Sequence, residues 1–199
     1  MSGAFPTTPV PARVELTSFA PTLVSVSHSL NRQVRSRGGQ RWRLTMQYPP
    51  LTRDELAPLF AFAVAQRGQF ETFTFVPPDL ATPRGAATGV PVVDGAGQTG
   101  RTLAIRGATA SVTGWLRAGD VIKLASGPKV YMVTADADTD ASGKATLSIE
   151  PALMSSPADG EAVMVRDVPF TVAFAGDSQT YTVEPGLIYG YQIDLVEVA

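Results

Sequence analysis

The chain has 199 residues, with 16 basic and 18 acidic side chains and a formal net charge of −2. A chain of this length buries roughly 70% of its unfolded surface on folding. Because it has no cysteine, disulfides, thiolate metal sites and a cysteine nucleophile are excluded. The small net charge gives no general attraction to nucleic acid or anionic membranes, and no apolar run approaches the ~20 residues of a membrane helix.

The N-terminal residues MSGAFPTTPVPAR lack the pattern of a secretory signal, and we expect them to form an extended N-terminal arm. After them, alternation of apolar and polar residues predicts two half-buried strands, at 13–19 and 23–30. The only histidine, His28, falls on the apolar side of the second strand, where we expect a structural role. No G-x-S-x-G elbow accompanies it, so no serine triad is indicated. The polar run 31–39 predicts a loop or hairpin tip before a third strand. The apolar face of that strand holds Trp42, Leu44, Met46 and Tyr48.

One helix is predicted, at about 52–67. Thr52 and Glu55 have the spacing of a capping box, in which each side chain satisfies a free N–H of the first turn. An apolar stripe with helical period follows. Its members are Leu56, Leu59, Phe60, Ala63 and Val64. Gly68 suits the left-handed position after the last turn, whereas Pro58 predicts a kink or a later true start.

A second unit is predicted where the composition changes at Asp79, after an aromatic strand at 70–76. Five short strand candidates separated by turn residues suit a small barrel or sandwich. They lie at 102–106, 121–124, 129–134, 145–150 and 162–165. Three longer strands, the last of which rejoins the first sheet, lie at 170–175, 179–183 and 187–198. The expected fold is mainly β, with 79–166 as a small β domain inserted in a discontinuous β-sandwich of 1–78 and 167–199.

A glycine motif lies near the start of the second predicted unit. Gly95, Gly97 and Gly100 spell G-x-G-x-x-G, which in a dinucleotide site opens a helix beneath the pyrophosphate. The residues that follow are strand-like, so we interpret the motif as a glycine-rich loop and predict no cofactor.

An aspartate motif also needs a structural context that the sequence does not supply. Asp136, Asp138 and Asp140 have the spacing that opens an EF-hand calcium loop, but Ala141 and Leu147 stand where glycine and the bidentate glutamate are required. We interpret the segment as a hairpin connection, with a degenerate metal site as the alternative. No catalytic or metal-binding residue is predicted.

Five arginines fall within one predicted hairpin. They are Arg32, Arg35, Arg37, Arg41 and Arg43. Such a cluster can track phosphates, pair with acidic residues of a neighbouring subunit, or face solvent. We favour the last two, because the chain is slightly acidic and aromatic interleaving of the kind that stacks bases is thin.

Several stretches together resemble the distal tail proteins of tailed bacteriophages, over most of the chain. They are FPTTPVPARVELTSFAPTLVSVSHS, GGQRWRLTMQYPPLTRDELAPLFAFAVAQRGQFETFTFVPP, GWLRAGDVIKL, KVYMVTADADTDASGKATLSIEPAL and YGYQIDLVEV. The strongest is the succession of aromatic strand, capped helix and aromatic strand. The resemblance implies a β-rich belt domain with a packed helix, and an inserted β domain that decorates the outside of a ring.

The resemblance also implies a structural role. Proteins of this family form rings, typically hexameric, at the tip of a long tail, where they join the tail tube to the hub and fibres. It implies no enzymatic step and no cofactor, a location in the virion after assembly in the host cytoplasm, no membrane partner, and a lumen for the passage of DNA. We expect Phe5 and Pro6 of the extended N-terminal arm to contact adjacent subunits, together with the five arginines.

Two other classes remain open. The chain could instead be a minor tail protein or a carbohydrate-binding module at the host surface, with Trp115 or Tyr131 as a stacking platform. The surroundings of both aromatics look equally like core or turn positions, and we favour that interpretation over a stacking platform. A cell-wall hydrolase is the third class, but the carboxylates are scattered and no acid/base pair can be nominated.

Overall fold

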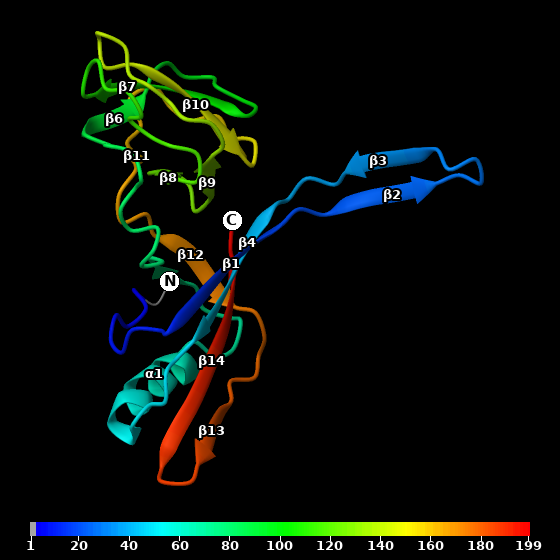
Figure 1. Cartoon of the computed structure of the whole chain (residues 1–199), viewed down its shortest axis with the longest axis vertical. Helices are drawn as coiled ribbons and strands as arrows, with labels where there is room; N and C mark the ends of the chain where they lie inside the picture. The colour runs from blue at the N-terminus through cyan, green and yellow to red at the C-terminus, as the bar shows by residue number, and fades with distance from the viewer. Residues whose placement is uncertain (1–2) are drawn as a thin grey trace. The chain divides into compact units, whose positions relative to one another are not determined.

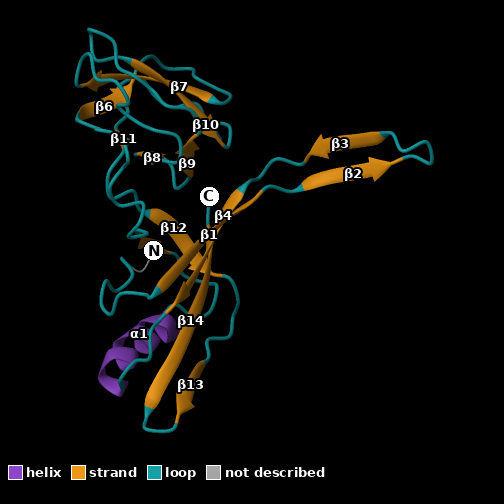
Figure 2. Cartoon of the chain, viewed as in Figure 1, coloured by secondary structure: helices purple, strands orange, loops and turns teal. Residues whose placement is uncertain are grey.

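The computed structural model describes residues 3–199 (Figure 1). The predicted mainly β class is confirmed, with fourteen strands and one helix in the described part (Figure 2). The chain divides into two compact units. Unit 1 comprises the described residues up to Phe73 together with Val172–Val198, and unit 2 comprises Thr74–Thr171. Among the described residues, no helix is long and apolar enough to cross a membrane.

A six-stranded sheet organises unit 1, in the order β1-β4-β14-β12-β5 with β13 attached to β14. The strands are β1 (Arg13–Phe19), β4 (Arg41–Gln47), β5 (Phe73–Phe75), β12 (Phe170–Phe174), β13 (Tyr181–Glu184) and β14 (Ile188–Glu197). The prediction for 13–19 is confirmed. All four residues predicted on the apolar face of the third strand are buried. Leu44 lies opposite Leu16 on one side and Leu195 on the other, so the apolar faces of three strands coincide.

Helix α1 (Arg53–Ala65) lies against this single large sheet, where the sequence predicted a pair of packed sheets. The capping box is confirmed, because the Glu55 carboxylate accepts from the Thr52 N–H and hydroxyl at 2.8 Å each. The later start expected from Pro58 is wrong, since the cap at Thr52 starts the helix and Pro58 lies inside it. After the helix, Gly68 adopts the expected left-handed conformation.

The buried face of α1 is rotated from the predicted stripe. Leu56, Leu59 and Ala63 are buried, but Val64 is 59% exposed. Viewed down the helix axis, with about 100° per residue, the buried residues run from Leu56 through Leu59 to Gln66. Val64 lies on the other side of Leu56, outside this buried face.

The aromatic strand predicted at 70–76 is shorter, because turns continue past the helix and only Phe73–Phe75 pairs. Phe70 is exposed, and the Arg67 guanidinium lies 4.8 Å from its ring centroid. The strand therefore begins only where the aromatic side chains become buried.

A two-stranded hairpin projects from the end of β1 and β4, formed by β2 (Thr22–Val26) and β3 (Arg32–Ser36) (Figure 1). Two predictions are wrong here: 23–30 is not half-buried, and 31–39 contains a strand. His28 is exposed in the turn between the strands, not on a buried face. The cause is the same for each, since no described element of unit 1 packs on either face of the hairpin.

Unit 2 is a six-stranded, barrel-like sheet in the order β11-β8-β9-β10-β7-β6. Its strands are β6 (Gly89–Val93), β7 (Thr102–Ala108), β8 (Val121–Leu124), β9 (Val130–Val133), β10 (Ala145–Glu150) and β11 (Val163–Met164). A bridge between Val92 and Ala162 nearly closes it. The sequence analysis does not predict β6, because its Gly and Pro residues favour a loop that leads into the second unit. The chain enters and leaves unit 2 side by side, because the Asp167 N–H donates to the Ala81 carbonyl at 2.8 Å.

Candidate functional site

The most exposed surface of unit 1 is the hairpin of residues 22–36, here called the arm. All ten strand residues of the arm are exposed. Val24 lies opposite Val34, and Val26 opposite Arg32. These three valines share one face and are 46%, 51% and 57% exposed for Val24, Val34 and Val26. A two-stranded hairpin that exposes three valines on one face, beside Arg32, is typical of an interaction surface.

The five arginines extend along the arm and onto β4. Arg32 and Arg35 belong to β3, Arg37 follows it, and Arg41 and Arg43 belong to β4. All five are exposed, and within residues 3–199 none of them forms an ion pair. The Arg43 guanidinium instead lies 4.3 Å from the centroid of the Phe19 ring. The arginines therefore extend along the hairpin and β4, with Arg32 on the face of the valines and Arg35 on the other face, and none is compensated by a carboxylate of the described residues.

The first described residues do not form the free, extended N-terminal arm that the sequence predicted. Phe5 is 4% exposed, and its ring lies 5.4 Å from that of Phe62 and 5.7 Å from that of Phe73. Pro6 is half-buried. Phe5 is thus a core residue of its own subunit, which corrects its assignment to a subunit interface. The apolar side chain is satisfied within unit 1 because α1 and β5 supply an aromatic pocket for it.

A second exposed surface lies where β13 turns into β14. This segment, residues 181–188, is called the tip. Tyr181, Val183, Leu187 and Ile188 are 40%, 53%, 72% and 41% exposed. β13 pairs only with β14 among the described strands, so its other edge carries unpaired backbone groups.

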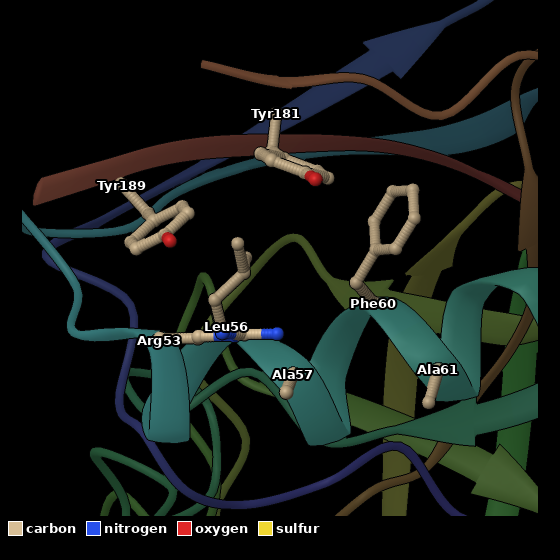
Figure 3. A pocket seen from close by; sticks show the side chains of 7 residues that line it. All are labelled: Arg53, Leu56, Ala57, Phe60, Ala61, Tyr181 and Tyr189. Atoms are coloured by element: carbon tan, nitrogen blue, oxygen red, sulfur yellow. The ribbon is translucent and has the colours of Figure 1, made fainter. Parts of the chain in front are cut away.

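A groove of about 340 Å³ lies between the tip and α1. Figure 3 shows Tyr181 and Tyr189 facing Leu56 and Phe60 of the helix across it. The Phe60 and Tyr181 rings meet edge to face at 4.9 Å. Arg53 is the one charged side chain of the lining. The groove suits apolar side chains and offers no carboxylate for acid/base chemistry.

Two buried tyrosines lie close to this groove. The Tyr48 and Tyr191 rings stack at 6.1 Å, and neither hydroxyl has a hydrogen-bond partner within the described residues. Burial raises the pKa of Tyr191 to about 12 and raises the pKa of Tyr48 further, with Tyr191 as a secondary cause. Both phenols stay neutral, so neither is a nucleophile at ordinary pH. The sequence predicted Tyr48 on an apolar strand face but gave no sign that its hydroxyl would lack a hydrogen-bond partner within the described residues.

The two aromatics considered for glycan stacking are core residues of unit 2. Trp115 is fully buried, and its Nε1–H donates to the Thr88 carbonyl at 2.8 Å. Tyr131 is also buried, and its hydroxyl accepts from the Met154 N–H at 3.2 Å. Since neither ring presents a face to solvent, the assignment of a stacking platform to them is corrected.

The two motifs singled out in the sequence have structural roles in unit 2. Gly95, Gly97 and Gly100 all have positive φ in the loop between β6 and β7, which confirms the loop interpretation. The Asp136 carboxylate accepts from the Ala118 N–H, and that of Asp138 from the Gly114 N–H. Within residues 3–199, no group of three or more His, Cys, Asp or Glu side chains is placed to hold a metal ion.

Comparison with known proteins bears on unit 2. Residues 81–168 match a family model described as distal tail protein pb9, B domain. The matched residues fall within Thr74–Thr171 and include all six strands of the barrel-like sheet. No curated protein matches the chain.

Proposed function

We propose, on the premise that residues 81–168 place this chain in the distal tail protein family of tailed bacteriophages, that its copies form a ring joining the tail tube to the tail-tip hub. Membership of the family gives the chain a structural role in the tail of the virion, in association with other tail components. The ring, of about six copies, is the finer proposal. Its function is carried by contacts between proteins, without a chemical step.

The observation that carries the proposal is the arm. A hairpin exposed on both faces, with three uncovered valines and a row of unpaired arginines, is poorly stable unless another chain covers it. Contact with an adjacent copy would bury the valines and compensate the guanidinium charges. Repeated from copy to copy, one such contact gives a closed ring.

The two units support a division of labour. Unit 1 carries the arm, and we assign to it the belt that forms the ring. Unit 2 has its own core and is attached where the chain enters and leaves together, so we assign to it the role of a domain decorating that ring. Attachment at one point suits an insertion, because the sheet of unit 1 continues on either side of it.

The proposal is tested by reversing the charge of the arm. We expect R32E/R35E/R37E to remain monomeric while wild type forms rings in negative-stain electron microscopy and by mass in solution. The matched control is R32K/R35K/R37K, which keeps the charge and should keep the rings. Circular dichroism checks that each variant is folded. Normal rings in the glutamate variant would contradict the role of the arm in assembly, and a wild-type chain that stays monomeric would contradict the ring and favour another kind of tail component.

A further inference from the structure

We infer that the arm of one copy docks on the tip of the next, with the edge of β3 added to the free edge of β13. The inference rests on the ring proposed above and names the surface of the neighbour that receives the arm. Three properties of unit 1 carry it: charge, exposed apolar residues, and the positions of arm and tip on the sheet.

Charge in unit 1 is separated along the sequence. Residues 16–53, which include the arm, contain six arginines and no carboxylate. Residues 172–198, which include the tip, contain four carboxylates and no lysine or arginine. Glu184 ends β13, is exposed, and forms no ion pair within the described part of the chain. Opposite charges at arm and tip favour contact between them and disfavour contact between two arms.

Apolar exposure marks the same two places. Of the large apolar side chains that unit 1 exposes, those on strands or hairpin turns lie mainly on the arm and the tip. The groove beside Tyr181 adds an apolar recess that can take a side chain of the arm. Each partner also offers a free strand edge, because among the described strands β3 pairs only with β2 and β13 only with β14. Strand addition would satisfy both edges.

The register of such an addition pairs specific residues. In a parallel addition, setting Val34 beside Val183 also sets their neighbours, Arg35 and Glu184, beside each other on the opposite face. One face of the junction then carries the two valines and the other carries an ion pair.

Arm and tip leave opposite ends of the sheet of unit 1 (Figure 1). The arm begins where Phe19 lies opposite Arg41, whereas the tip lies beyond the bridge between Leu51 and Tyr189. Arm and tip of one copy therefore do not meet. A contact between two different surfaces, repeated head to tail, gives a ring when its rotation closes.

Cysteine cross-linking tests the contact directly, since the natural chain has no cysteine. V34C and V183C chains are mixed under assembly conditions and oxidised, and a disulfide-linked dimer is expected on a non-reducing gel. The control mixture pairs V34C with V90C, an exposed position in unit 2, and should give no more than background. A single chain carrying V34C/V183C should give a ladder that ends at the copy number of the ring.

Charge exchange gives a second, independent readout. R35E and E184R should each weaken ring assembly about tenfold or more, because like charges then meet at the junction. R35E/E184R restores opposite charges in every contact and should restore assembly. Wild-type rings that give no V34C–V183C dimer and are unaffected by E184R would overturn this contact while leaving the ring intact. A wild-type chain that never assembles would overturn both.

Discussion

At the scale of single residues, one buried carboxylate holds the start of unit 2 in place. Asp120 is almost fully buried, and its side chain accepts from the backbone N–H groups of Arg84, Gly85 and Arg117 at 2.6, 3.1 and 2.8 Å. We expect D120A to lower the free energy of unfolding by about 1–3 kcal/mol or more, because buried donors lose their acceptor. Urea unfolding measures the change.

The control for this prediction is D138A. Asp138 is exposed and accepts one N–H, so its loss should cost less than about 1 kcal/mol. Equal effects of D120A and D138A would show that Asp120 does not anchor the segment.

A surface ion pair gives unit 2 a defined response to pH. Arg106 is the main cause that lowers the pKa of Asp159 to about 2, and the Gly95 N–H adds to it. A depressed pKa stabilises the folded state above the unfolded value of about 4, and this contribution is lost as pH falls from about 4 to about 2.

We therefore expect D159N to be less stable than wild type at pH 6 and the difference to shrink below pH 4. Urea midpoints between pH 2 and 6 at constant ionic strength test this. A difference that stays constant over the whole range would contradict the assigned pairing.

At the scale of elements, α1 shows that an apolar residue of a helix need not lie on its buried face. L59A should cost about 2–5 kcal/mol, because Leu59 is fully buried between the helix and the sheet. V64A should change stability by less than about 0.5 kcal/mol, because Val64 is largely exposed. Urea unfolding of both variants compares the two faces directly, and a V64A variant as unstable as L59A would place the buried face wrongly.

Which elements are predictable from the sequence depends on what covers them. The strands at 13–19, 121–124 and 145–150 are predicted with the observed bounds, because alternation or turn residues report their place in the sheet. The arm has the same alternation, Val24 and Val26 against serines, yet lies open in the single chain. Its pattern fits burial against something outside the subunit, and a pattern cannot say in which chain the cover lies.

The candidate surfaces are predictable in part. The five arginines are visible in the sequence, and the structure adds that none of them forms an ion pair within residues 3–199. The tip is not visible, because Leu187 and Ile188 have the composition of a core strand. The burial of Trp115 and Phe5 is equally hidden, since an aromatic residue near a turn or a proline-rich segment suits either a core or a binding platform.

At the scale of the whole molecule, the insertion should be removable. Replacing residues 82–166 with a short Gly/Ser linker should leave unit 1 folded and able to form rings, because Ala81 and Asp167 are already hydrogen-bonded neighbours. Electron microscopy and mass in solution test assembly. The excised unit should unfold cooperatively by itself, since it has its own core. Loss of rings in a folded deletion variant would show that unit 2 takes part in assembly.

The central position of β14 has a consequence for biosynthesis. β14 lies between β4 and β12, yet it is translated after every other strand of its sheet. Until β14 has been synthesised, one edge of β4 has no partner strand, and the sheet lacks its central strand. A nascent chain interrupted before Ile188 therefore cannot complete the sheet from which the arm projects, so premature termination products would be kept out of the proposed ring by their own failure to fold.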